Sequence, residues 1–119
     1  MPQKKMTILD VQAKKRKKQP LTMVTAYDYP TAQLVEESDV DIILVGDSVA
    51  MVVLGMENTV SITMSEMLHH CRAVSRGATK PLLVGDMPFM SYATVEDAVR
   101  NAGRFLKEAG MDVIKLEKE

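Results

Sequence analysis

The chain has 119 residues, of which 46% are hydrophobic and 26% are charged, so its composition is that of one folded domain and excludes a disordered segment. No apolar run reaches the roughly 18 residues of a membrane span, and the lysine-rich start lacks the apolar segment of a signal peptide. The single cysteine, Cys71, excludes an internal disulfide. We interpret it as a buried thiol in a reducing compartment, and we expect a cytoplasmic protein without membrane partners.

The net charge is -1, but the start of the chain is strongly basic, and we call residues 1–20 the basic head. Residues 1–20 hold seven bases and one acid, so the remainder of the chain is acidic. A block such as Lys14–Lys18 occurs in nucleic-acid-binding patches, but here neither aromatic nor glycine residues are interleaved with it. We therefore interpret it as the solvated end of a helix and expect no nucleic-acid partner. Salt-sensitive binding to an oligonucleotide would contradict this interpretation.

Four short apolar runs predict β-strands. An acid closes each run, and runs this continuous are typical of strands that are covered on both faces of a sheet. The predicted strands, each with the acid that follows it, are 21–25 with Asp28, 42–45 with Asp47, 82–84 with Asp86, and 113–116 with Glu117.

Helical patterns lie between and before these strands. Thr63 and Glu66 have the spacing of a capping box, and apolar residues then recur at helical intervals up to Gly77. A similar pattern ends at Gly110, and Pro30 suits a first helical position. The predicted helices are 7–17, 31–38, 63–77 and 94–110.

The alternation of strands and helices from residue 21 onward predicts a parallel sheet with right-handed crossovers. We expect a single α/β domain over residues 1–119, with a basic N-terminal helix in residues 1–20 and βα units in residues 21–117. The segment 51–62 is too long for a simple turn, so we interpret it as a functional loop after the second strand.

A short repeat marks two of the predicted strand ends. The segments 44–47 and 83–86 both read Leu-Val-Gly-Asp and lie 39 residues apart, about the length of one βα unit. We expect each glycine to let the chain turn off the sheet and each aspartate to project at the carboxyl end of its strand. Open α/β sheets and β/α barrels both bind ligands at this edge.

Asp47, Asp86 and Glu117 come from three strand ends that a parallel sheet brings to one rim. Carboxylates crowded there need a cation, and hard oxygen ligands select Mg²⁺ or a similar ion. Lys115 faces the same way as Glu117 and is well placed for a substrate carboxylate. A single acid at a strand end more often caps the next helix, but this set together favours a site for a divalent cation and a small anionic ligand.

Several segments, in order, resemble the ketopantoate hydroxymethyltransferases over about residues 7–117. The resemblance implies a parallel β/α (TIM) barrel, of which this chain holds about the first half: an N-terminal helix, then four strands that alternate with three helices. The matching segments are Thr25-Ala-Tyr-Asp-Tyr-Pro30, Asp41-Ile-Ile-Leu-Val-Gly-Asp-Ser48, Met51-Val-Val-Leu-Gly55, His69-His70 with Arg76-Gly-Ala78, Asp86-Met-Pro-Phe-Met-Ser-Tyr92, and Val113-Ile-Lys-Leu-Glu117.

The resemblance also implies an activity, the transfer of a hydroxymethyl group from 5,10-methylenetetrahydrofolate to 3-methyl-2-oxobutanoate. The product is 2-dehydropantoate, for pantothenate and coenzyme A biosynthesis. By the family pattern, Asp47, Asp86 and Glu117 match the magnesium ligands, and Asp47, Ser48, Asp86 and Lys115 match the residues that hold the keto acid. A 2-oxo acid chelates such an ion through its carboxylate and ketone oxygens, and the cation stabilises the enolate formed on deprotonation.

Two departures from the family pattern bear on activity. Ala50 stands where the family commonly has glycine, a change that we expect only to tighten the loop. Lys118 and Glu119 replace the usual Gly-Gly, and the family's general base is a glutamate in the four further strands of its barrel. We therefore expect the 119-residue chain alone to have little or no activity, and its open strand edges to favour a homo-oligomer.

The alternative from a different class is a metal-binding receiver module of the flavodoxin type, which also has about 120 residues and acids at strand ends. Receivers need paired acids after the first strand and a lysine after a fifth strand, whereas Asp28 stands alone here. His69 and His70 lack a partner at metal-ligand spacing, so we interpret them as surface or interface residues. For Tyr27, Asp28 and Tyr29, which lie at a strand end, lining the pocket and packing beside it are equally compatible with the sequence.

Overall fold

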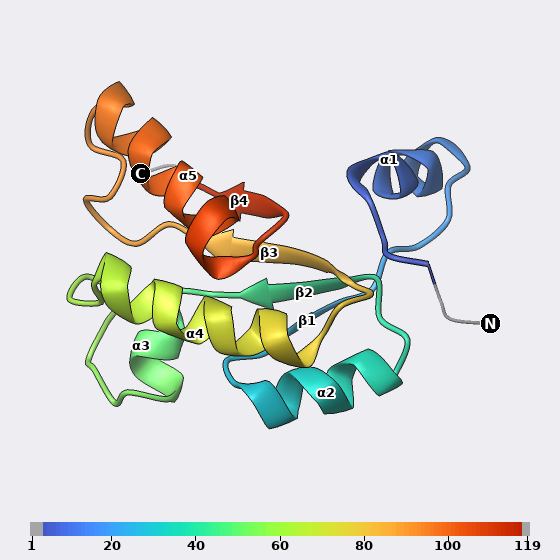
Figure 1. Cartoon of the computed structure of the whole chain (residues 1–119), viewed down its shortest axis with the longest axis horizontal. Helices are drawn as coiled ribbons and strands as arrows, with labels where there is room; N and C mark the ends of the chain where they lie inside the picture. The colour runs from blue at the N-terminus through green and yellow to red at the C-terminus, as the bar shows by residue number, and fades with distance from the viewer. Residues whose placement is uncertain (1–3, 118–119) are drawn as a thin grey trace.

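Parallel strands alternate with helices through the part of the chain that the structure, a computed structural model, describes: residues 4–117 (Figure 1). Compared with the prediction, β1 is two residues shorter, β3 two residues longer and β4 one residue shorter. The short helix α3 begins two residues before the segment 51–62, which we expected to be a loop, and includes the first two residues of that segment. In chain order the elements are α1 (Ile8–Arg16), β1 (Met23–Thr25), α2 (Tyr29–Glu37), β2 (Ile42–Val45), α3 (Val49–Val52), α4 (Met64–Gly77), β3 (Leu82–Asp86), α5 (Val95–Ala109) and β4 (Val113–Lys115).

The strands form one parallel sheet in the order β1-β2-β3-β4, so each strand pairs with its neighbour in sequence. Such consecutive pairing is the arrangement found in a closed β/α barrel. It contradicts the receiver alternative, because a flavodoxin-like sheet places its second strand outside the first, in the order 2-1-3-4-5.

One face of the sheet is covered by helices and the other is largely open. Ile43, Val45 and Leu83 are buried on the face that packs against α4 and α5. Leu44 and Val84 point the opposite way and remain partly exposed, and every residue of β1 is exposed. Our prediction that the strands are covered on both faces is therefore wrong for the described residues, because the second face has no layer packed over it.

Side-chain caps set where the helices begin. The Thr63 hydroxyl accepts the backbone N–H of Glu66 at 3.1 Å, and the Glu66 carboxylate accepts the backbone N–H of Thr63 at 3.0 Å, which confirms the predicted capping box. Helix α2 begins at Tyr29, two residues before the predicted start. The reason is that Asp28 caps it by accepting the backbone N–H of Thr31 at 2.9 Å.

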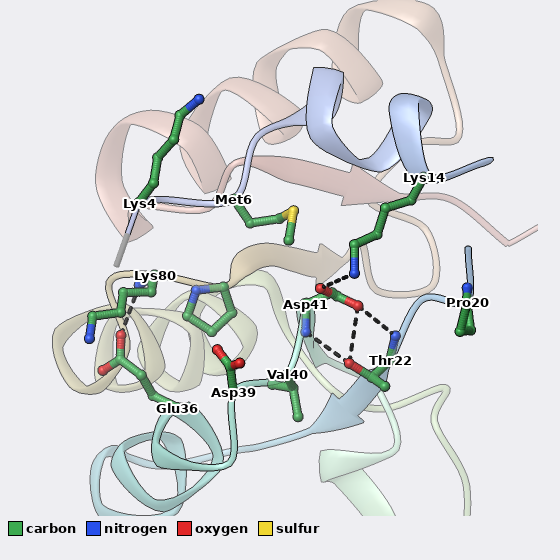
Figure 2. A pocket seen from close by; sticks show the side chains of 11 residues that line it. Lys4, Met6, Lys14, Pro20, Thr22, Glu36, Asp39, Val40, Asp41 and Lys80 are labelled. Atoms are coloured by element: carbon green, nitrogen blue, oxygen red, sulfur yellow. Dashed lines mark hydrogen bonds and ion pairs between the residues drawn. The ribbon is translucent and has the colours of Figure 1, made fainter. Parts of the chain in front are cut away.

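Helix α1 lies beyond the amino-terminal ends of the strands, far from α3 (Figure 1). Lys14 Nζ donates to Asp41 at 3.0 Å, and the backbone N–H of Thr22 donates to the same carboxylate at 2.9 Å (Figure 2). Burial alone would raise the pKa of Asp41, but the contacts with Thr22 and Lys14 outweigh it and lower that pKa. Lys5 pairs with Asp112 at 2.6 Å. Two bases of the basic head therefore anchor this segment to the sheet, which is a structural role.

The two glycines of the repeat serve close packing. Neither Gly46 nor Gly85 has a positive φ, and Gly85 lies inside β3. A Cβ at Gly85 would lie 2.7 Å from Cδ1 of Phe105, a fully buried side chain of α5. The expectation that both glycines turn the chain off the sheet is therefore wrong for Gly85, because α5 packs directly onto the strand at this point.

Candidate metal centre

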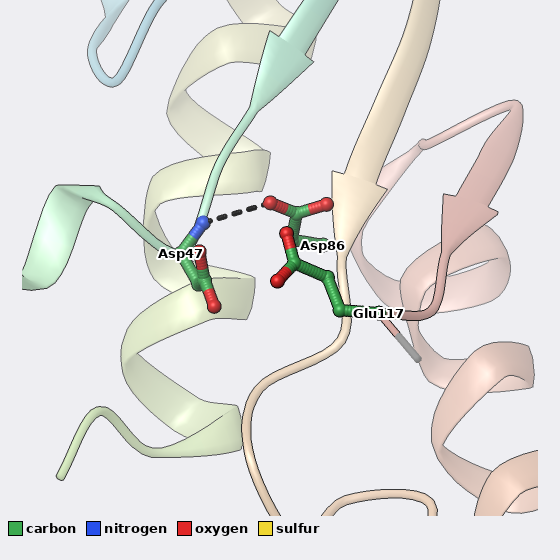
Figure 3. Close-up of side chains that lie close together, drawn as sticks. All are labelled: Asp47, Asp86 and Glu117. Atoms are coloured by element: carbon green, nitrogen blue, oxygen red, sulfur yellow. Dashed lines mark hydrogen bonds between the residues drawn. The ribbon is translucent and has the colours of Figure 1, made fainter. Parts of the chain in front are cut away.

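Three carboxylates meet at the carboxyl ends of neighbouring strands, as the sequence predicts (Figure 3). Asp47 follows β2, Asp86 is the last residue of β3, and Glu117 follows β4. One carboxylate oxygen from each residue lies within 4.8 Å of the other two. Asp86 is buried, Asp47 is half-buried and Glu117 is exposed, so the cluster is open to solvent on the side of Glu117.

The two aspartates of the repeat are in direct contact. The backbone N–H of Asp47 donates to Oδ2 of Asp86 at 3.0 Å (Figure 3). Gly46 leaves room for this contact, because a Cβ there would lie 3.1 Å from Oγ of Ser48 and 3.4 Å from Oδ2 of Asp86. The absence of a side chain at this glycine thus accommodates two residues of the site, a role that the sequence alone did not reveal.

Lys115 lies among the carboxylates. Its Nζ is 2.8 Å from Oε1 of Glu117 and 3.2 Å from Oδ1 of Asp86. The hydrogen bond that Lys115 donates to Glu117 raises the pKa of the Lys115 ammonium, and the same contact lowers the pKa of Glu117. One ammonium ion faces three carboxylates, so the cluster keeps an excess of negative charge.

The electrostatics of Asp47 show the effect of this crowding. Burial raises the pKa of its carboxyl, and the charges of Asp86 and Glu117 raise it further. A divalent cation would relieve that repulsion. Mg²⁺ takes six oxygen ligands at about 2.0–2.1 Å and usually keeps several waters, so three carboxylates at these separations suit coordination that is partly direct and partly through water. Asp47, Asp86 and Glu117 therefore fit a magnesium ion.

The fourth residue predicted to contact a keto acid, Ser48, lies at the start of α3 beside Asp47. Its Oγ is 2.8 Å from the phenol oxygen of Tyr27, which lies in the short segment between β1 and α2. Tyr27 therefore belongs to the wall of the site, whereas Asp28 does not join the cluster, because its carboxylate caps α2.

Tyr92 and His70 support the site through hydrogen bonds that the sequence did not predict. The Tyr92 hydroxyl donates to the backbone carbonyl of Glu117 at 2.8 Å and so holds the chain beside that carboxylate. His70 Nδ1 lies 2.8 Å from the carbonyl oxygen of Tyr27. His70 is half-buried, and the neighbouring His69 is exposed. Tyr92 ends the segment Asp86-Met-Pro-Phe-Met-Ser-Tyr92, whose resemblance to the family is the sequence signal for it.

Comparison with known proteins identifies the family. A family model described as ketopantoate hydroxymethyltransferase matches residues 5–119. The chain belongs to this family. A member from Syntrophus aciditrophicus (strain SB), named 3-methyl-2-oxobutanoate hydroxymethyltransferase, is 56% identical over 115 residues, which cover 96% of this chain and 42% of the relative. A member of the same name from Clostridium acetobutylicum is 60% identical over 104 residues, covering 87% of this chain and 38% of the relative. The chain thus spans well under half the length of these ketopantoate hydroxymethyltransferases.

Solved structures of other enzymes share the fold. Phosphonopyruvate hydrolase in complex with oxalate and Mg²⁺ has a TM-score of 0.72 at 16% identity, covering 87% of this chain and 36% of that one. A 2,3-dimethylmalate lyase of the PEP mutase/isocitrate lyase superfamily has a TM-score of 0.70 at 14% identity, covering 93% and 39%. These likenesses concern the fold alone, and they confirm the predicted partial β/α (TIM) barrel for this ketopantoate hydroxymethyltransferase family member.

The two departures from the family pattern differ in what the structure says of them. Ala50 is fully buried in α3, close to Ser48. Lys118 and Glu119 lie outside the described residues.

Across residues 4–117, each helix is too short or too polar to cross a membrane.

Proposed function

We propose that this chain holds Mg²⁺ and 3-methyl-2-oxobutanoate in a ketopantoate hydroxymethyltransferase, which transfers a hydroxymethyl group from 5,10-methylenetetrahydrofolate to give 2-dehydropantoate. The observation that carries the proposal is the cluster of Asp47, Asp86 and Glu117 at the carboxyl ends of three strands, in a chain of this family. The phosphonopyruvate hydrolase of similar fold was solved with oxalate and Mg²⁺. Oxalate has carboxylate oxygens on adjacent carbons, as a 2-oxo acid has carboxylate and ketone oxygens, which supports this class of ligand.

Different residues of the chain bind the ion and the keto acid. Asp47, Asp86 and Glu117 hold the ion directly or through water. Ser48 donates its hydroxyl hydrogen to the keto-acid carboxylate, and the Lys115 ammonium compensates the charge of that carboxylate. The ion, when bound, supplies a Lewis acid that polarises the ketone and acidifies the neighbouring C–H.

Calorimetric titration of the 119-residue chain, first with Mg²⁺ and then with 3-methyl-2-oxobutanoate, tests the proposal. We expect Asp86→Asn to weaken Mg²⁺ binding by about tenfold or more, since it removes a charged ligand from the buried side of the cluster. Asp39→Asn is the matched control, because Asp39 is exposed in a turn with φ of 60°, which asparagine also tolerates. A wild-type chain that binds no Mg²⁺, or equal affinities for both variants, would contradict the proposal.

Turnover is proposed for the whole protein, because the chain spans about two fifths of its relatives. We propose that the general base and part of the folate site lie in the remainder of the family's barrel. The 119-residue chain should therefore form little or no 2-dehydropantoate from the keto acid and methylenetetrahydrofolate. Robust turnover by the purified chain would contradict this part of the proposal.

We also propose that the chain self-associates. Met23 and Val24 are exposed on the edge strand β1, and Val95 and Val99 are exposed on α5. Unpaired strand edges and exposed apolar side chains favour association with another chain. Sedimentation velocity across a range of protein concentrations should show species larger than one chain, and a monomer throughout would contradict the proposal.

The proposed compartment is the reducing cytoplasm. Cys71 is a free, fully buried thiol in α4. Burial raises the pKa of this thiol to about 12, so the reactive thiolate is strongly disfavoured. These properties support the interpretation of Cys71 as a plain core residue.

A further inference from the structure

Two hydrogen bonds connect helix α4 to the rim of the metal centre through one tyrosine. The phenol oxygen of Tyr27 lies 2.8 Å from Oγ of Ser48, and the backbone carbonyl of the same tyrosine lies 2.8 Å from Nδ1 of His70. Both distances are those of well-formed hydrogen bonds. The contacts join residues 21 and 43 positions apart in the chain, so neither follows from local structure.

The direction of the second hydrogen bond follows from its chemistry. A carbonyl oxygen only accepts, so Nδ1 of His70 carries the hydrogen and donates it to Tyr27. The next residue, Asp28, is fixed as well, because it caps α2 through the backbone N–H of Thr31. The backbone of Tyr27 is thus held by α4 on one side and by α2 on the other, and its half-buried ring is oriented toward Ser48.

We propose that Tyr27 is a positioning residue for Ser48, and that His70 is a positioning residue for Tyr27. This inference rests on the proposed function. A serine hydroxyl has one hydrogen to donate, and a keto-acid carboxylate only accepts. When Ser48 donates to that carboxylate, the Tyr27 phenol must be the donor in the Tyr27–Ser48 pair. The phenol then fixes the orientation of the serine hydroxyl and polarises it toward the ligand.

A double-mutant cycle separates this role from simple packing. Tyr27→Phe keeps the ring and removes the hydroxyl, so we expect the dissociation constant of 3-methyl-2-oxobutanoate to rise about threefold to tenfold in the magnesium-loaded chain. The affinity for Mg²⁺ itself should not change. In a Ser48→Ala background, Tyr27→Phe should have no further effect, because the group that it orients is gone. Tyr29→Phe is the matched control, since the Tyr29 phenol is exposed and contacts Gln33.

His70 is tested by removal and rescue. His70→Ala should weaken keto-acid binding to the same degree as Tyr27→Phe, and His70→Asn should restore much of it, because the asparagine amide places a donor near the position of Nδ1. Equal losses from Tyr27→Phe with and without the Ser48 hydroxyl, or an asparagine variant as weak as the alanine variant, would overturn the inference alone. A wild-type chain that binds Mg²⁺ but no keto acid would overturn the proposed function and this inference with it.

Discussion

Replacing Lys115 with methionine tests whether its ammonium ion competes with Mg²⁺ for the carboxylates. The ammonium lies 3.2 Å from Asp86 and 2.8 Å from Glu117, so a cation that binds these oxygens has to displace it. The Lys115 side chain is 43% exposed and that of Asp86 only 4% exposed. After allowance for solvent screening, the ion pair between Lys115 and Asp86 stabilises the metal-free site by about 1 kcal/mol. Lys115→Met should therefore strengthen Mg²⁺ binding roughly fivefold.

Isothermal titration of the metal-free chain with Mg²⁺, at fixed ionic strength, measures this change directly. Lys107→Met is the control, because Lys107 is exposed in the last turn of α5, apart from the carboxylate cluster. The same Lys115 variant should bind 3-methyl-2-oxobutanoate more weakly, since it loses the charge that compensates the ligand carboxylate. Unchanged or weaker Mg²⁺ binding by Lys115→Met would refute the idea that the ammonium occupies the place of the ion.

Three further predictions concern stability, and urea unfolding checks each of them. Gly85→Ala should lower the free energy of unfolding by about 1–3 kcal/mol, because its Cβ would lie 2.7 Å from the Phe105 ring, whereas Gly103→Ala, with open space around it in α5, should raise it by about 0.5–1 kcal/mol. Equal effects at the two glycines would contradict the packing argument. Thr63→Ala should cost about 1 kcal/mol through loss of the α4 cap, and no loss would show that the cap is dispensable. Asp41→Asn should destabilise the chain at neutral pH. The folded-state pKa of Asp41 is lowered, so the stability that its carboxylate contributes is present above the unfolded pKa and is lost as the pH falls through the folded pKa. The difference in free energy of unfolding between Asp41→Asn and wild type should therefore shrink in acid. A difference that stays constant with pH would contradict this.

The strand ends show what a local sequence pattern can predict and what it cannot. The repeated Leu-Val-Gly-Asp segments predicted correctly that both aspartates reach one rim. Relative to the repeat, β2 and β3 pair with a shift of one residue, so that Leu44 lies opposite Val84. In a strand, a shift by one residue exchanges the faces. The contact between the Asp47 backbone and the Asp86 carboxylate therefore depends on how the chain leaves β2, which the repeat does not encode.

The buried side of the site shows a second limit of the sequence. His70 has no metal-ligand spacing, and for Tyr27 the sequence is equally compatible with lining the pocket and with packing, so the sequence predicts no defined role for either residue. Their contacts with each other and with Ser48 form only when α4 packs beside the segment that follows β1. His70 and Tyr27 support Ser48 only through tertiary packing, which brings together residues that are distant in the chain.

By itself, the sequence determined the helices α1, α2, α4 and α5, their order with the strands, and the identity of the three carboxylates. Helix caps and apolar periodicity act over three or four residues, and the rule that parallel strands end on one edge needs only that order. The tertiary structure decided the one-residue shift between β2 and β3, the single covered face of the sheet, the packing of Phe105 onto Gly85, and the place of Lys115 among the carboxylates. Each of these depends on distances between residues far apart in the sequence, and those distances exist only once the helices have packed on the sheet.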